Sequence, residues 1–163
     1  MTVADPMRDY FGIGGGLAAV TLAGMAAAVG LEAAYGHGFP PVLAVMPAVA
    51  GTLMIGAGLA LNALAARQMI RAVQQETLAT AGPFAWSRNP MYASFIFLTV
   101  PGAALVLRNW FMLVLVSAVM LAWFYARVGR EEQKLTAMFG GEYRAYQARV
   151  GRLLPRLGRR PMR

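Results

Sequence analysis

The sequence contains no cysteine and only one histidine in 163 residues. It therefore has no disulfide bonds, thiolate nucleophiles or cysteine metal sites, and one histidine leaves little material for a metal centre. Charged residues are also scarce, at 13% of the chain compared with about 25% in soluble domains. Hydrophobic residues reach 58%, and the mean hydropathy is +0.52. This balance indicates an integral membrane protein, and the length allows one domain over residues 1–163.

Four apolar runs are of the length that membrane-spanning helices require, which is about 20 residues. We therefore expect an all-α integral membrane protein with four transmembrane helices. The expected spans cover about residues 12–35, 41–66, 90–107 and 110–128. Asn89 and Pro90 predict the start of the third helix, as an N-cap followed by proline at the first helical position. Pro101 is expected to kink that helix.

The region 129–163 is predicted to be a cytosolic C-terminal segment. The fourth helix becomes charged without a helix breaker, so we expect it to leave the membrane and continue to about Phe139, where Gly140 and Gly141 end it. A short amphipathic helix should follow to about Val150, with one apolar face. The remaining tail is basic, contains two prolines and is expected to lie on the surface or to fray.

The distribution of basic residues predicts the orientation. With four spans, the N-terminus, the connection between the second and third spans and the C-terminus lie on one side. Together they hold 14 of the 15 Lys and Arg residues, whereas Arg108 falls on the other side. The positive-inside rule then places both termini in the cytoplasm. Basic residues beside hydrophobic spans are explained by anionic lipid headgroups, so we expect no nucleic-acid partner.

Two polar segments interrupt this apolar sequence, and both fall on the side predicted to be cytoplasmic. The first covers residues 81–92 and the second covers residues 130–146. Arginine suits a carboxylate or phosphate, glutamate suits an ammonium group or ribose hydroxyls, and aromatic faces suit an adenine ring or a sulfonium cation. A structural alternative explains the same residues: Arg88 extends to the interface, and the acidic pair balances neighbouring basic residues. Composition and spacing alone indicate a polar site of unassigned purpose.

The polar segments also share an ordered pattern with a known enzyme family. The first reads GPFAWSRNPMY, and the second, with the residues that follow it, reads EEQKLTAMFGGEYRAYQARVGRLLP. Together they resemble the isoprenylcysteine carboxyl methyltransferase family and its phospholipid methyltransferase relatives. The resemblance runs from Thr80 to Pro155 across a short hydrophobic hairpin. The matching positions are Gly82, Pro83, Phe84, Arg88, Asn89, Pro90, Tyr92, Glu131, Glu132, Leu135, Phe139, Gly140, Tyr143, Tyr146, Arg149, Val150 and Arg152.

The resemblance implies S-adenosylmethionine as the cofactor, held at the cytosolic side between the hairpin and the C-terminal segment. It suggests catalytic roles for Arg88, Arg127 and Glu132, with Arg127 one helical turn before Glu131, where it could meet an anionic substrate group. The residues that it implies for cofactor binding are Gly82, Pro83, Phe84, Asn89, Pro90, Tyr92, Glu131, Glu132, Leu135, Phe139 and Tyr143. No metal is expected.

The expected activity is methyl transfer to a lipophilic acceptor, such as a lipid amine, a carboxylate or a thiol. Prenylcysteine methyltransferases typically have histidine at the position of Asn89, and the asparagine form resembles a bacterial branch of broader substrate range. We therefore expect location in a bacterial inner membrane. If the nucleophile is an amine, Glu132 or Tyr92 is a candidate proton acceptor. Two alternatives stay open, a membrane reductase that uses a nicotinamide cofactor and a small non-catalytic membrane scaffold.

Overall fold

The described chain is helical and contains no β-strand among the residues described. The structure is a computed structural model that describes residues 4–36 and 45–156. One isolated β-bridge joins Ser87 to Gly151. The helical elements are α1 (Ala4–Tyr35), α2 (Val45–Gln74), the 3-10 helix η2 (Gly82–Ala85), α3 (Pro90–Ser94), the π-helix η3 (Phe95–Thr99), α4 (Val100–Val106), the π-helix η4 (Met112–Val116) and α5 (Ser117–Arg149).

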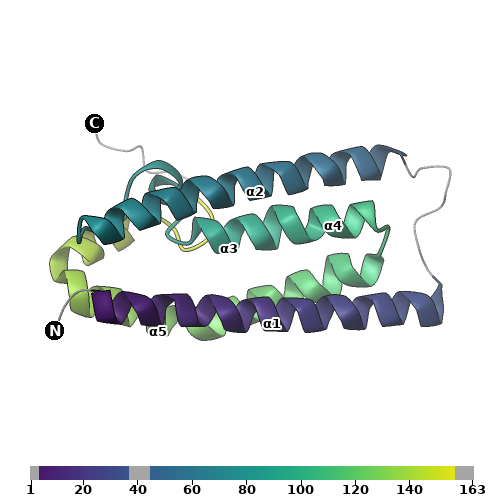
Figure 1. Ribbon diagram of the computed structural model, residues 1–163, viewed down its shortest axis with the longest axis horizontal. Helices are drawn as coiled ribbons and strands as arrows, with labels where there is room; N and C mark the ends of the chain where they lie inside the picture. The colour runs from purple at the N-terminus through teal and green to yellow at the C-terminus, as the bar shows by residue number, and fades with distance from the viewer. Residues whose placement is uncertain (1–3, 37–44, 157–163) are drawn as a thin grey trace.

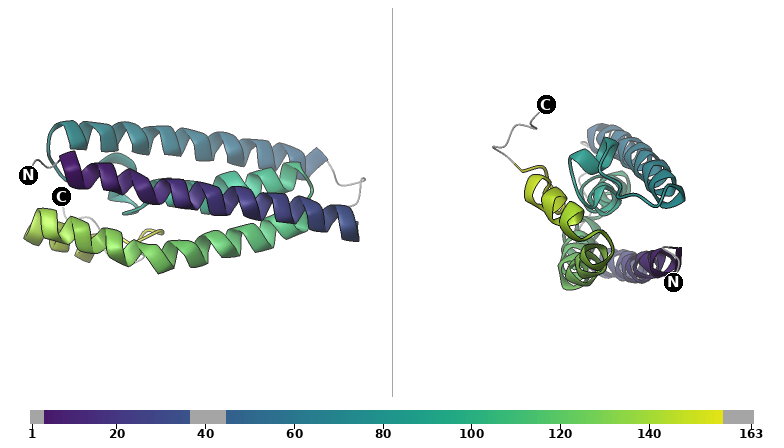
Figure 2. Two further views of the ribbon diagram at one scale, coloured as in Figure 1. Left: turned by 60° about the horizontal axis from the view of Figure 1, so that its bottom comes forward. Right: turned by 90° about the vertical axis from the view of Figure 1, so that its left-hand side faces the viewer.

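The helices form an elongated up-and-down bundle (Figure 1). In that view α1 and α5 lie along one side, while α2 lies beside the continuous helix made by α3, η3 and α4. Figure 2 shows the same pairing from two other directions. The start of α1, the connection from α2 to α3 and the end of α5 all lie at one end of the bundle (Figure 1). This is the end at which both polar segments are found.

Three helical stretches are long and apolar enough to cross a membrane, namely Gly16–Tyr35, Val45–Gln74 and Met112–Arg149. A shorter apolar helix covers Pro90–Val106. The prediction of an all-helical integral membrane protein is therefore confirmed. The first helix begins earlier than the apolar run, at Ala4, and α2 continues beyond its run. The expected start of the second run, at residues 41–44, lies outside the described residues.

Close packing between α2 and α4 depends on two glycines that face each other. A Cβ atom at Gly102 would lie 2.7 Å from the carbonyl oxygen of Gly51, and one at Gly51 would lie 2.9 Å from a methyl group of Val106. Small residues allow helix backbones to approach closely in membrane proteins. The facing glycines thus set the distance between α2 and α4.

The start of the third helix is placed correctly by the sequence, but its capping differs from the expectation. Asn89 is the N-cap residue and Pro90 follows, yet the Asn89 side chain makes no capping hydrogen bond. Its Nδ2 atom instead donates to the carbonyl oxygen of Arg152, 3.1 Å away. The Asn89 side chain therefore does not cap the helix. It connects the start of the helix to the segment after α5.

The third helix is irregular just before Pro101. Residues Phe95–Thr99 form a π-helical turn, in which the N–H of Val100 donates to the carbonyl oxygen of Phe95. Pro101 has no N–H to donate, and a widened turn is a common way for a helix to accommodate an interruption of this kind. The sequence predicted a kink at Pro101, whereas the structure has a π-helical turn on the N-terminal side of this residue.

The tight turn between α4 and η4 contains a buried asparagine. Arg108 has a positive φ of 53°, and Asn109 is 3% exposed. The Oδ1 atom of Asn109 accepts from the N–H of Met112 at 2.7 Å, while its Nδ2 donates to the carbonyl oxygen of Ala28 at 3.1 Å. The sequence predicted the turn but not this bond, which attaches the turn to α1.

Helix α5 changes direction at Gly140, as the sequence predicted. Gly140 has φ 54° and ψ −120° inside the helical stretch, a conformation that glycine adopts without steric cost. The following turns bury Tyr143, Tyr146 and Val150 in one cluster, which confirms the predicted apolar face. The expectation for the start of the tail was wrong, because Leu153 is 5% exposed and the chain here is held by hydrogen bonds to the first polar segment.

Candidate functional site

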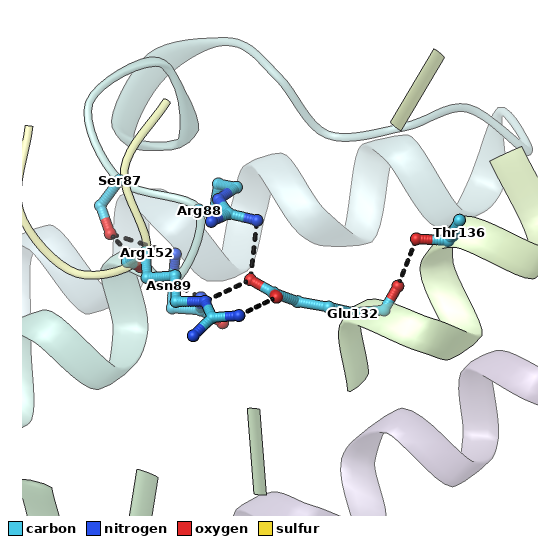
Figure 3. Close-up of polar contacts among 6 residues, drawn as sticks. All are labelled: Ser87, Arg88, Asn89, Glu132, Thr136 and Arg152. Atoms are coloured by element: carbon cyan, nitrogen blue, oxygen red, sulfur yellow. Dashed lines mark hydrogen bonds and ion pairs between the residues drawn. The ribbon is translucent and has the colours of Figure 1, made fainter. Parts of the chain in front are cut away.

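The two polar segments meet through a buried ion pair between Arg88 and Glu132. Arg88 lies in the loop before α3, and Glu132 lies on α5, where the Thr136 hydroxyl donates to its backbone carbonyl (Figure 3). Nη1 of Arg88 is 2.7 Å from Oε1 of Glu132, and the side chains are 7% and 9% exposed. Breaking a buried ion pair by removing one partner leaves an uncompensated charge. This pair therefore fixes the relative position of the two segments.

Arg152 supplies a second guanidinium group to the same carboxylate. Its Nε and Nη2 atoms donate to Oε1 and Oε2 of Glu132 at 3.0 and 2.7 Å (Figure 3). This bidentate hydrogen bonding to Glu132 raises the pKa of Arg152 above its usual range. The carbonyl oxygen of Arg152 accepts from Ser87 Oγ and from Asn89 Nδ2, both at 3.1 Å. The backbone N–H of Arg88 donates to the carbonyl oxygen of Gly151 at 2.8 Å. The residues after α5 thus close over the first polar segment.

Glu131 and Glu132 are consecutive residues in different surroundings. Successive residues of an α-helix point about 100° apart, and only Glu132 faces the two arginines. Glu131 is 2% exposed, and its Oε1 accepts from the Tyr92 hydroxyl at 3.0 Å. A cavity of about 10 Å³ is lined by Tyr92, Glu131 and Arg127 among others. The two glutamates therefore belong to separate sites: Glu132 contacts the two arginines, and Glu131 contacts Tyr92.

An apolar groove of about 410 Å³ runs between the helices of the bundle. Its lining is mainly hydrophobic and comes from α1, the end of α2, the helix from α3 to α4, and α5, with Leu17, Met25 and Met120 as examples. Arg88 and Tyr92 also line it and give it one polar end. A groove of this volume falls within the range of small-molecule sites, and its lining suits a ligand with a long apolar part.

A second cavity of about 50 Å³, which we call the inner cavity, lies between the end of α2, the first polar segment and α5. Phe84 and Arg88 line both this cavity and the apolar groove. The Tyr146 hydroxyl donates to the carbonyl oxygen of Phe84 at 2.6 Å and so fixes η2. The other predicted residues in its lining are Leu135, Phe139 and Tyr143. The inner cavity therefore gathers aromatic and apolar groups from both polar segments.

The other predicted site residues lie in three kinds of place. Asn89, Pro90 and Tyr92 line the apolar groove. Gly82 and Pro83 belong to η2 and, among the described residues, are absent from the lining of the apolar groove and of the two smaller cavities described above. Arg127 is exposed, and its guanidinium carbon lies 4.2 Å from the ring centre of Trp123, which is cation–π geometry. Arg127 is thus near Glu131 rather than near the pair of Arg88 and Glu132.

Several residues of the inner cavity were missed by sequence reasoning. Met69 and Leu78 come from the end of α2 and the connection after it, while Lys134 and Met138 come from α5. Lys134 and Met138 follow Glu131 at helical spacing, so the period of the helix could have indicated them. The residues from α2 carried no signal, because an apolar side chain near the end of a span is ordinarily part of the packing.

Comparison with known proteins gives one family and two relatives. The model of the isoprenylcysteine carboxyl methyltransferase family matches residues 42–137. The Protein-S-isoprenylcysteine O-methyltransferase of Saccharomyces cerevisiae is 35% identical over 78 residues, which are 48% of this chain and 32% of the yeast protein. The protein of the same name from Schizosaccharomyces pombe is 33% identical over 78 residues, covering 48% of this chain and 33% of that protein. This chain therefore spans about a third of the length of either relative. No solved structure gives a significant match.

Proposed function

Because the chain belongs to the isoprenylcysteine carboxyl methyltransferase family, we propose that it transfers a methyl group from S-adenosylmethionine to a lipophilic acceptor at a membrane surface. The observation that carries the proposal is the pair of adjoining cavities, which share Phe84 and Arg88. Two substrates that bind in adjoining cavities can bring their reacting atoms together at the shared boundary. The family match favours this function over a nicotinamide-dependent reductase or a non-catalytic scaffold.

S-adenosylmethionine would bind in the inner cavity. The faces of Phe84, Phe139 and Tyr143 suit an adenine ring or a sulfonium cation. Arg88 suits a carboxylate, and its buried Nε has no hydrogen-bond partner among the described residues. The chemistry of the lining thus fits the cofactor. The volume of about 50 Å³ is smaller than the sites that hold small molecules, so the surrounding side chains must move apart when the cofactor binds.

The acceptor would bind in the apolar groove, with its reactive group at the end formed by Arg88 and Tyr92. The groove is lined by four helical elements of the bundle, so a lipid can reach it sideways from the bilayer. The names of both yeast relatives include isoprenylcysteine. For this chain we propose the broader class of lipophilic amines, carboxylates and thiols, because Asn89 stands at the position of the histidine typical of prenylcysteine methyltransferases.

The residues of the site would act mainly by positioning. S-adenosylmethionine supplies an electrophilic methyl group when bound. Glu132 holds Arg88 and Arg152 in fixed positions, and this ion-pair network keeps the boundary between the cavities rigid. The apolar groove excludes water from the nucleophile, which favours a reaction in which opposite charges are neutralised. Correct orientation of two reactants contributes ~7–11 kcal/mol at best.

The same proposal includes the topology. We propose four spans in one domain of residues 1–163, with the helix Pro90–Val106 as the short third span. Both termini and both polar segments would then face the cytoplasm, since that side carries most basic residues. The part of α5 after about residue 128 would extend beyond the membrane, and a bacterial inner membrane would be the location.

Calorimetry with S-adenosylhomocysteine tests the cofactor site directly in detergent-purified protein. We expect saturable binding, which Arg88→Ala and Glu132→Ala weaken by at least ~tenfold because each removes one partner of the buried ion pair. A matched control is Arg144→Ala, since Arg144 is an exposed residue of α5, the helix that carries Glu132. Membrane lipid extracts incubated with isotopically labelled cofactor would identify the acceptor by mass spectrometry. Absence of any binding by the parent protein would refute the proposed function.

A further inference from the structure

Glu131 is a buried carboxylate with one oxygen that the ion-pair network does not use. It is 2% exposed, and its Oε2 has no hydrogen-bond partner among the described residues. Oε1 is the atom that accepts from the Tyr92 hydroxyl, at 3.0 Å. An ionised carboxylate that is buried and incompletely paired is costly, and proton uptake removes that charge. Glu131 is therefore suited to receive a proton through Tyr92.

Tyr92 connects this carboxylate to the groove. It lines the apolar groove and also the small cavity that Glu131 lines. Its ring packs against Phe124, with ring centres 5.3 Å apart, so the hydroxyl is held in place from a second side. A tyrosine in this position can take a proton from a group in the groove while passing its own proton to the carboxylate.

A water molecule in the small cavity would give the proton a way out. Its volume of about 10 Å³ approaches the space of one water molecule. Trp123, whose buried Nε1 has no hydrogen-bond partner within the described part of the chain, lines it together with the exposed Arg127. Two residues with an unpartnered polar atom, Glu131 and Trp123, thus line one water-sized cavity together with the exposed Arg127.

We propose that Tyr92 and Glu131 form a proton relay for the methyl acceptor, and that the acceptor is a lipophilic molecule whose nucleophilic atom carries a proton, an ammonium or a thiol. This inference rests on the proposed methyl transfer. The acceptor proton moves to the Tyr92 oxygen as the Tyr92 proton moves to Oε1 of Glu131. The freed lone pair forms the new bond to the methyl carbon, and the carbon–sulfur bond of the sulfonium breaks with its electron pair going to sulfur. A carboxylate acceptor is already ionised and would not need this relay.

Among the described side chains, few charged and titratable groups surround Glu131. Tyr92 faces it from α3, while Glu132 and Lys134 act on it from its own helix, and Arg127 lines the same cavity. The contribution of α1 to this cavity is Leu17, which is apolar. A change in the pH dependence of the rate on Glu131→Gln would therefore report on this carboxylate and on Tyr92.

The test compares three acceptors of matched chain length, hexadecylamine, hexadecanethiol and hexadecanoic acid, in the presence of labelled S-adenosylmethionine. We expect label on the amine or the thiol, and a fall in kcat of ~100-fold or more for Glu131→Gln and Tyr92→Phe. With the amine, the rate of Glu131→Gln should rise ~tenfold per pH unit below the amine pKa, because deprotonation then depends on bulk solvent. Glu142→Gln makes the same chemical change at an exposed position of α5 and should match the parent.

Calorimetry separates failure of the relay from failure of the proposed function. We expect Glu131→Gln to bind S-adenosylhomocysteine with unchanged Kd, whereas a cofactor-binding role for Glu131 would weaken binding. Label on hexadecanoic acid alone, or no label on any acceptor despite cofactor binding, overturns the relay and leaves the cofactor site standing. A weakened Kd for Glu131→Gln also overturns it. No cofactor binding by the parent overturns both proposals.

Discussion

Arg88 and Glu132 form a buried ion pair of 2.7 Å between the loop before α3 and the middle of α5. Arg152 completes the group by binding both oxygens of the same carboxylate. The carboxylate at the centre of this network therefore holds three separate stretches of the chain in one arrangement. Stability and cofactor binding should depend on the same residues as a result.

Removing one partner of the pair should cost more than removing both. Arg88→Ala or Glu132→Ala alone is expected to destabilise the protein by ~3–5 kcal/mol, because a buried charge loses its partner. The double variant Arg88→Ala and Glu132→Ala should lose less than the sum of the two. Chemical unfolding in detergent measures the three values. Simple additivity would contradict direct coupling between the two side chains.

Arg152 should contribute less, because its side chain is 44% exposed. We expect Arg152→Ala to lower the free energy of unfolding by about 1 kcal/mol, less at high salt. Arg152→Lys should recover only part of the loss, since lysine cannot bind the carboxylate through a planar pair of donors. Arg149→Ala, at an exposed position shortly before it, is the control. Equal behaviour of the alanine variants at positions 149 and 152 would count against this role.

The facing glycines of α2 and α4 give a prediction independent of the site. Gly102→Ala should destabilise the bundle by ~1–3 kcal/mol, because its Cβ would overlap the backbone of α2. Gly56→Ala is the matched control on α2, since a Cβ there meets nothing within 4 Å. It should be neutral or stabilising by ~0.5–1 kcal/mol. Thermal unfolding of both variants in detergent measures the two effects. If Gly56→Ala were more destabilising than Gly102→Ala, α2 and α4 would not pack through the facing glycines.

The absence of cysteine makes the proposed topology easy to test. Each single-cysteine variant carries one thiol, because the chain has none of its own. In oriented membrane vesicles, a membrane-impermeant maleimide should label Gln75→Cys and Arg144→Cys from the cytoplasmic side and Leu107→Cys from the opposite side. All three positions are exposed. Labelling of Gln75→Cys and Leu107→Cys from the same side would refute a membrane crossing by the helix Pro90–Val106.

Much of the helical organisation followed from local features of the sequence. The length of the apolar runs gave the membrane helices, Pro90 gave the start of the third helix, and Gly140 gave the change of direction in α5. Each of these follows from neighbouring residues alone. The resemblance likewise led to the family that the comparisons show. The roles of the individual site residues stay predictions, and their tests are the variants described above.

The differences from expectation come from contacts between distant parts of the chain. Asparagine is a common N-cap residue, yet the side chain of Asn89 bonds to the backbone of Arg152. The tail was expected to lie on the surface or to fray, but Leu153 near its start is buried. Asn109 lies between the predicted third and fourth spans, and nothing in the sequence indicated that its side chain bonds to α1. A polar side chain can satisfy its hydrogen bonds locally or at a distance, and the sequence does not specify which.

The sequence by itself determined that this is a helical membrane protein with two polar segments, because hydrophobicity, charge and helix breakers act over short stretches of chain. Only the tertiary structure decided which side chains of the two segments contact each other. It placed Glu132 between two arginines and the adjacent Glu131 beside Tyr92. The physical reason is that neighbouring helical side chains point in different directions, so packing of the helices determines which partner each one meets.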